Sequence, residues 1–343
     1  MVLNRNPDFR QLGKVLAGEI PDRFTPFEFM LNERLYQTYA PEYFPPDQPV
    51  GFRQYVLAQV RTFARLGYDA AVIYGSDFRF PTVQRQSKST VSLNDGALIT
   101  DRASFECCPF SSPAQADTGV LDEAAAILPE GMKLIICGPC GVLENVIALV
   151  GYKNLCMMMY DDEKLTEDVF AAVGSRLTEY YAIAMQHPAV GALMSNDDWG
   201  FKTQTMLSTE AMRRYVFPWH KEIVATAHRL GKPAILHSCG YFDNILEDII
   251  TDMRYDARHS YEDAILPVEK AYERMRGRIA VLGGIDLDFL VNASPAQITE
   301  RSSAMLRRTA RYGGYALGTG NSVPEYVPHE HYMAMHRCVE AAQ

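Results

Sequence analysis

Two residues with metal-binding chemistry close a short apolar run: His237 and Cys239 stand two positions apart in segment 234–240. If this run is a strand, both side chains point to the same side of it, because strand side chains alternate with a period of two. Imidazole and thiolate are good zinc ligands, so the pair offers half of a metal site. Histidines and cysteines that only fill space in a core are also common, and this stretch alone does not decide between the two interpretations.

Other apolar runs of the chain also end in polar residues that can do chemistry. If these runs are parallel strands of a barrel, their carboxyl ends meet at one mouth, where functional groups of such folds gather. The residues expected there, beside His237 and Cys239, are Asp77, Cys137, Asn196 to Asp198, His259, Asp286 and Asn321. Any barrel carries some polar residues at this edge, so their position predicts a site and not yet a mechanism.

The composition is that of a folded protein without a membrane segment. Of the 343 residues, 48% are hydrophobic and 22% are charged, and no stretch approaches the length of about 18 consecutive apolar residues that a membrane helix needs. The formal net charge of −9, with no concentration of Lys and Arg, argues against a nucleic-acid partner. It also disfavours a strongly polyanionic substrate.

The amino-terminal residues and the cysteines favour a cytoplasmic location. The sequence begins Met-Val-Leu-Asn-Arg-Asn-Pro-Asp, which contains no apolar signal region, so we do not expect secretion. Seven cysteines are an odd number, and without an export signal they are expected to be reduced thiols and not a disulfide framework. We therefore expect a soluble protein of the cytoplasm.

Apolar runs and helical periodicity alternate along the chain, which is typical of βα units. The predicted strands, each followed by a helix, lie at 24–31, 68–74, 133–137, 191–195, 233–237, 256–260, 279–286 and 315–321. This pattern predicts a single (β/α)8 TIM barrel that forms one domain over residues 1–343. A helical extension is expected at 6–16. An inserted excursion near 79–112 lacks helical periodicity and is expected to carry substrate contacts or a lid.

Several motifs resemble the uroporphyrinogen decarboxylase superfamily. They are His-Ser-Cys-Gly at 237–240, Leu-Gly-Gly-Ile-Asp at 282–286, Gly-Thr-Gly-Asn at 318–321, Asn-Asp-Asp-Trp-Gly at 196–200 and Ile-Tyr-Gly-Ser-Asp at 73–77. The resemblance covers nearly the whole chain and is most specific from about residue 192 onward. It implies a (β/α)8 barrel, in agreement with the pattern of strands and helices.

The first chemistry of this superfamily is decarboxylation of a tetrapyrrole. True uroporphyrinogen decarboxylases resemble one another in an arginine-rich motif near the amino terminus, which grips substrate carboxylates. The corresponding region here, residues 35–43, has no such motif, and carboxylates need charge-assisted donors to be held. Only Asp77 is retained, at the place of the pyrrole-binding aspartate. A decarboxylase of tetrapyrrole metabolism is therefore the alternative and not the preferred function.

The chain resembles the cobalamin-dependent methyltransferases of the superfamily more closely. In that branch a His-x-Cys pair and a second Cys near the last strand bind zinc. His237 and Cys239 match the pair, but Asn321 stands where the second Cys is expected. Zinc accepts oxygen ligands, so Glu144 or Asp198 is a candidate to complete a mixed site, as are the thiols of Cys137 and Cys140.

The resemblance implies a zinc-dependent methyl transfer between a small methyl donor or acceptor and a corrinoid protein that carries cob(I)alamin or methylcobalamin. Zinc would act as a Lewis acid on the heteroatom of the substrate. The absence of the second Cys favours a methoxylated compound and O-demethylation. The candidate catalytic residues are Asp77, Asp198 and Glu144, the candidate metal ligands are His237 and Cys239, and the candidate substrate-binding residues are Asn196, His259 and Asn321.

Two further alternatives stay open. The motif Cys137-Gly-Pro-Cys140 has the spacing of thioredoxin-type redox centres, but it is not part of a thioredoxin-sized βαβ unit and is also ordinary turn chemistry. Its cysteines are candidates for redox, for an auxiliary metal role or for simple packing. A non-catalytic barrel that binds a corrinoid, a tetrapyrrole or a partner protein is a third functional class, which metal content and a methyl-transfer assay would separate from the others.

Overall fold

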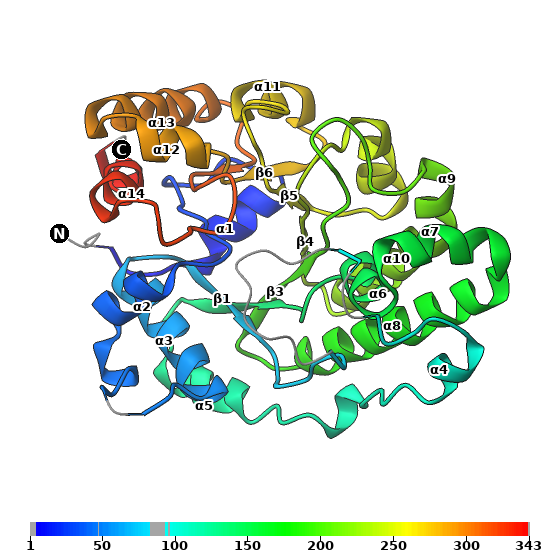
Figure 1. Ribbon diagram of the computed structural model, residues 1–343. Coiled ribbons are helices and arrows are strands. Elements are labelled where there is room, and N and C mark those ends of the chain that lie inside the picture. Colours follow the sequence, from blue (N-terminus) through cyan, green and yellow to red (C-terminus); the bar gives the residue numbers. More distant parts are fainter. Residues whose placement is uncertain (1–4, 47, 83–92, 95–96, 342–343) are drawn as a thin grey trace.

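A sheet of seven parallel strands organises the protein. The computed structural model describes residues 5–46, 48–82, 93–94 and 97–341. In these residues the strands follow one another in sequence order across the sheet, and the sheet curls with helices on its outer side (Figure 1). The strands are β1 Ala70–Tyr74, β2 Lys133–Cys137, β3 Val190–Asn196, β4 Ala234–His237, β5 Ala257–His259, β6 Ala280–Leu282 and β7 Tyr315–Ala316. The fold is therefore α/β and TIM-like, as predicted.

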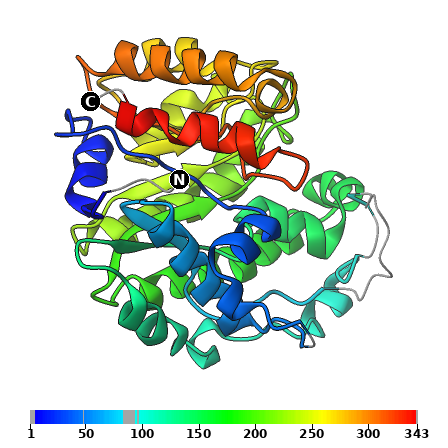
Figure 2. The same ribbon diagram turned by 90° about the vertical axis from the view of Figure 1, so that its left-hand side faces the viewer.

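Helices precede β1, separate successive strands and follow β7. They are α1 Phe9–Leu16, α2 Glu33–Tyr39, α3 Phe52–Arg65, α4 Arg102–Glu106, α5 Val120–Ile127, α6 Val142–Val150, α7 Tyr152–Asp161, α8 Glu163–Ala184, α9 Thr209–Ala211, α10 Phe217–His228, α11 Val268–Met275, α12 Leu287–Asn292, α13 Pro295–Thr309, α14 His329–His336 and α15 Cys338–Ala341. Short helices of other types are η1 Pro41–Tyr43, η2 Pro113–Gln115, η3 Met212–Val216, η4 Asp243–Ile245 and η5 Asp248–Asp252. Figure 2 shows α13 and α14 packed side by side.

Alternation along the strands separates two cores. Val72 of β1 belongs to the inner core, whereas its neighbour Ile73 packs toward the helices, because successive side chains point to opposite faces of a strand. The inner core also contains Leu12 and Val15 of α1. α1 lies within the segment 6–16, and its apolar side packs among the inward-facing residues of the strands.

The eighth predicted strand, at 24–31, is not confirmed. Its only sheet contact among the described residues is a parallel bridge between Pro26 and Leu317, beside β7. The backbone N–H of Phe27 donates to Leu317 O at 2.8 Å, and Leu317 N–H donates to Thr25 O at 3.0 Å. Pro26 has no N–H to donate, which limits pairing on this segment.

Residues 209–228 form three consecutive helical parts, α9, η3 and α10, and Pro218 stands in the first turn of α10, directly after η3. Of the excursion at 79–112, residues 83–92 and 95–96 lie outside the described part of the chain, and the described remainder contains α4. No single helix of the described residues is long and apolar enough to cross a membrane; α6 and α7 reach that length only as a pair bent by 92°.

Candidate functional site

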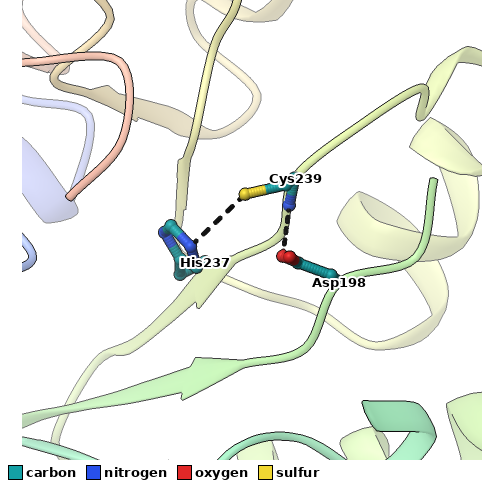
Figure 3. Close-up of side chains that lie close together, drawn as sticks. All are labelled: Asp198, His237 and Cys239. Atoms are coloured by element: carbon teal, nitrogen blue, oxygen red, sulfur yellow. Dashed lines mark hydrogen bonds between the residues drawn. The ribbon is translucent and has the colours of Figure 1, made fainter. Parts of the chain in front are cut away.

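Three different donor groups converge where β3 and β4 end. One ligand atom from each of Asp198, His237 and Cys239 lies within 4.8 Å of the other two (Figure 3). Strand pairing brings them together: Asn196 pairs with His237 across β3 and β4, so the residues just after each strand meet at the same edge. The structure thus places the predicted pair His237 and Cys239 side by side and adds the carboxylate of Asp198 to it.

Cys239 is held on several sides. Its Sγ lies 3.6 Å from His237 Nε2 and 3.7 Å from Ser260 Oγ, and its backbone N–H donates to Asp198 Oδ1 at 2.9 Å. Burial first, and then the charge of Asp198, raise the pKa of the Cys239 thiol to about 12. The thiol is therefore protonated at neutral pH unless a bound cation stabilises the thiolate. Sequence reasoning missed Ser260, although it follows β5 directly.

His259 lies behind His237 and not in the open part of the site. The two Nδ1 atoms are 2.7 Å apart, and His259 Nε2 lies 3.1 Å from the backbone oxygen of Thr319. Burial lowers the pKa of His259 to about 3, and burial followed by the neighbouring His259 lowers the pKa of His237 well below its ordinary value. Both imidazoles are therefore neutral, which is the form in which a histidine binds a metal.

Asn321 contacts the sulfur from the loop after β7. Its Nδ2 donates to Cys239 Sγ at 3.2 Å, while its Oδ1 accepts from the backbone N–H of Ser322 at 2.7 Å. An amide nitrogen has no free lone pair for a cation. At the position where the resemblance led us to expect a second cysteine, the protein instead has an amide that donates a hydrogen bond to the sulfur of Cys239.

Two glycines allow the backbone around Cys239 to pack closely against the loop after β3. Gly240 has φ +86°, and a Cβ added to it would lie 2.0 Å from Gly200 O. The backbone N–H of Gly200 points to Cys239 O at 3.3 Å, and Tyr241 N–H donates to Phe201 O at 2.8 Å. Only glycine fits both the positive φ and this close approach, so the contact sets the position of Cys239 relative to Asp198.

Comparison with known proteins shows the family of this chain. Residues 99–342 match the family model described as Uroporphyrinogen decarboxylase (URO-D), which is well over half of the chain. The chain belongs to the URO-D family. No curated protein sequence matches it.

A solved methyltransferase structure shares the fold of this URO-D family member. A methyltransferase from Methanosarcina mazei superposes with a TM-score of 0.68 at 17% identity, over 98% of this chain and 99% of that one. A putative vitamin-B12 independent methionine synthase from Listeria monocytogenes has a TM-score of 0.48 at 12% identity, over 99% of this chain and 98% of that one. The first likeness shows a shared fold, and the second is too low to support a conclusion.

A second acidic group in this URO-D protein lies beside the donor triad. Glu144 is in the first turn of α6 and accepts from Gly141 N–H at 3.0 Å. Burial, followed by the charges of Asp197 and Asp198, raises the pKa of Glu144 to about 8. Asp197 is buried and accepts from Glu144 N–H at 3.0 Å and from His220 Nε2 at 2.9 Å. Asp197 therefore fixes the start of α6 next to Asp198.

A buried cation lies behind the donor triad. Arg258 is only 1% exposed, and its guanidinium donates to the backbone oxygens of Ser238 and Ser260 and lies 3.6 Å from the centre of the Phe242 ring. In the described part of the chain it makes no ion pair with a carboxylate. Its positive charge therefore acts on the carboxylate and thiol groups of the site. Sequence reasoning gave Arg258 no role in the site, because a charged residue inside a strand gives no signal that it will be buried.

The other predicted residues make contacts outside the triad. Asp77 is exposed, and its Oδ1 accepts from Asp117 N–H at 2.9 Å. Asn196 accepts from Gly138 N–H at 3.2 Å. Cys137 belongs to the inner core, where burial raises its pKa, and Cys140 has φ +63°; both are free thiols. These four residues do not belong to the group of donors formed by Asp198, His237 and Cys239.

Proposed function

We propose that this URO-D family member is a methyltransferase that moves a methyl group between a small substrate and a corrinoid protein, with zinc held by Asp198, His237 and Cys239. The observation that carries the proposal is the convergence of one oxygen, one nitrogen and one sulfur donor within 4.8 Å at the ends of two barrel strands. Catalytic zinc sites have three protein ligands and keep a position open for substrate. The fold shared with a methyltransferase from Methanosarcina mazei supports the same activity.

The donor groups fit zinc in charge as well as in type. A neutral imidazole, a thiolate and a carboxylate together carry the charge that balances a divalent cation. When bound, the metal would supply a Lewis acid that polarises the heteroatom of the substrate. The corrinoid of the partner protein would accept or donate the methyl group.

The residues of the chain prepare this position. Asn321 donates to Cys239 Sγ, and the positive charge of Arg258 lies behind Ser238 and Ser260, so both favour the anionic form of the sulfur. The guanidinium adds a positive charge on the Ser238 and Ser260 side of the site, where it contributes a positive field. Such a field stabilises an anion that forms there, as an alkoxide or phenolate does when its methyl group is removed.

The oxygen ligand favours an oxygen substrate. A carboxylate is a harder ligand than the thiolate that the resemblance led us to expect, and it donates less electron density to the cation. Asp198 in place of a second thiolate therefore supports a methoxylated compound as methyl donor, in an O-demethylation. Glu144, which retains a proton at neutral pH, is the candidate to protonate the departing oxygen.

Metal content and a spectral assay test this proposal together. Purified protein is expected to contain one zinc per chain, and Cys239→Ser protein to lose it. With a panel of methoxylated donors, the protein is expected to convert cob(I)alamin to methylcobalamin, followed by the change in cobalamin absorbance. Failure with every donor, combined with full activity of metal-free protein on a porphyrinogen, would support the decarboxylase alternative that the family description also allows.

A further inference from the structure

We infer that His259, Thr319 and Glu28 are positioning residues that decide which nitrogen of His237 faces Cys239 and Asp198. The inference rests on the proposed function only in taking that nitrogen to be a metal ligand. Hydrogen bonds link these residues in series. They run from the buried carboxyl group of Glu28 to Thr319, from Thr319 O to His259, and from His259 to His237. Among the described residues, the side-chain partners of Cys239 Sγ are His237, Ser260 and Asn321, so these three residues act on the site only through others.

A backbone carbonyl sets the proton position on His259. Thr319 O accepts from Gly284 N–H at 2.9 Å and lies 3.1 Å from His259 Nε2. A carbonyl oxygen can only accept, so His259 Nε2 carries a hydrogen. Because His259 is buried and neutral, its Nδ1 then has a lone pair and no hydrogen.

The proton position on His237 follows from that of His259. The two Nδ1 atoms are 2.7 Å apart, which is a hydrogen-bond distance, so one of them carries a hydrogen. Since His259 Nδ1 does not, His237 Nδ1 must donate. The Nε2 of neutral His237 is then unprotonated and directs its lone pair to the side of Cys239 Sγ, 3.6 Å away. The opposite tautomer would place two lone pairs against each other at 2.7 Å.

Glu28 holds Thr319 in place. Its side chain is 1% exposed, and it accepts from Thr319 N–H at 2.9 Å through Oε1. Thr319 Oγ1 lies 2.5 Å from both Glu28 Oε2 and Asn321 O, although a hydroxyl has only one hydrogen to donate. Both contacts are satisfied when Glu28 is protonated and donates to Thr319 Oγ1, which in turn donates to Asn321 O.

Glu28 therefore supports two ligands at once. Through Thr319 O and His259 it orients His237, and through Thr319 Oγ1 it holds the backbone of Asn321, whose amide donates to Cys239 Sγ. This gives the segment at 24–31 a role that its single bridge to Leu317 does not explain. Removing a partner that orients a ligating histidine typically lowers metal affinity by about 10- to 100-fold.

Nitrogen NMR of the metal-free protein tests the tautomers directly. In protein labelled with 15N at histidine, long-range proton–nitrogen correlations are expected to show His237 protonated at Nδ1 and His259 protonated at Nε2. A His237 ring protonated at Nε2 in the parent protein overturns the inference. This readout needs neither bound metal nor activity, so it decides the inference even if the proposed methyl transfer fails.

Zinc affinity, measured by competition with a chromogenic chelator, tests the consequence. His259→Leu is expected to weaken zinc binding about 10- to 100-fold. His336→Leu is the matched control, because His336 is also buried and hydrogen-bonded to a carbonyl, Leu66 O, away from the site, and it should bind zinc like the parent. Equal affinities of the His259 and His336 variants would contradict a positioning role.

Glu28 needs its own pair of variants. Glu28→Gln retains a donor for Thr319 Oγ1 and an acceptor for Thr319 N–H, so its zinc affinity is expected to stay near that of the parent. Glu28→Leu removes both and should weaken zinc binding by about 10-fold or more. If Glu28→Leu does not fold, NMR of Glu28→Gln protein still tests the inference. His237 in this variant is expected to be protonated at Nδ1, as in the parent, and protonation at Nε2 would contradict the inference.

Discussion

The side-chain nitrogen of Asn321 lies 3.2 Å from Cys239 Sγ and donates a hydrogen bond to it, while the side-chain oxygen accepts from Ser322 N–H. Asn321 thus contacts the donor sulfur from the far side of the barrel mouth without presenting its nitrogen to a cation. The third donor comes instead from Asp198, directly after β3. A site with one thiolate and one carboxylate differs from a site with two thiolates in how strongly it polarises a bound oxygen.

Replacing Asn321 by cysteine is expected to add a second thiolate beside Cys239. Asn321→Cys protein should bind zinc more tightly than the parent, because thiolate is a soft ligand that zinc prefers to an amide. After cobalt substitution its sulfur-to-metal charge-transfer absorption should be stronger. Ser322→Cys is the control, and the idea fails if both variants show the same increase.

Removing the charge of Asp198 is expected to weaken zinc binding more than about 100-fold, beyond the effect usual for residues outside the ligand shell. Asp198→Asn keeps an oxygen that accepts from Cys239 N–H, so the fold should be retained. Asp77→Asn is the matched control, since Asp77 bonds to Asp117 N–H away from the triad. Chelator competition measures both, and an unchanged affinity of the Asp198 variant would remove Asp198 from the ligand set.

Glu28 is expected to make the folded state less stable as the pH rises. Burial raises the pKa of Glu28 to about 8, from 4.5 in the unfolded chain. Between these values the folded state binds one proton more than the unfolded state, so the free energy of unfolding falls with pH by up to about 1.4 kcal/mol per pH unit. The contribution is fully present below pH 4.5 and is lost as the pH passes the folded value of about 8.

Urea unfolding between pH 5 and pH 8.5 measures this slope in the parent and in Glu28→Gln. The variant lacks the titrating group, so its stability should depend less on pH over this range. If the two proteins show parallel profiles, Glu28 does not carry a raised pKa. The measurement is independent of the NMR test, because it reports protonation of Glu28 and not the tautomer of His237.

Gly240→Ala is expected to destabilise the protein and to weaken zinc binding. The left-handed backbone alone costs a residue with a Cβ about 1 to 2 kcal/mol, and at Gly240 the added Cβ also meets Gly200 O. Gly231→Ala is the control, because Gly231 has φ +65° and nothing within 4 Å of the added atom. Thermal unfolding should show a larger loss for Gly240→Ala, and only this variant should lose zinc affinity. Similar losses in both would mean that the close approach to Gly200 is not needed.

Patterns local to one segment were readable from the sequence. Apolar runs at 133–137 and 233–237 predicted β2 and β4, and the two-residue period of a strand placed His237 and Cys239 on one side. The family motifs were equally readable, and membership of the URO-D family is confirmed. Both kinds of signal depend on residues that are neighbours along the chain.

The tertiary structure decided what depends on contacts between distant segments. Asp198 joins the triad because the register of β3 and β4 pairs Asn196 with His237, and no local pattern encodes a register. Segment 24–31 makes a single bridge, at Pro26, where a full strand was predicted, and Pro26 offers no N–H to a second neighbouring strand. Glu28 and Thr319, 291 positions apart, meet only in the folded barrel. The sequence by itself determined the fold class, two metal-ligand candidates and several candidates for a third donor, whereas the choice of Asp198 among them and the orientation of His237 follow from packing.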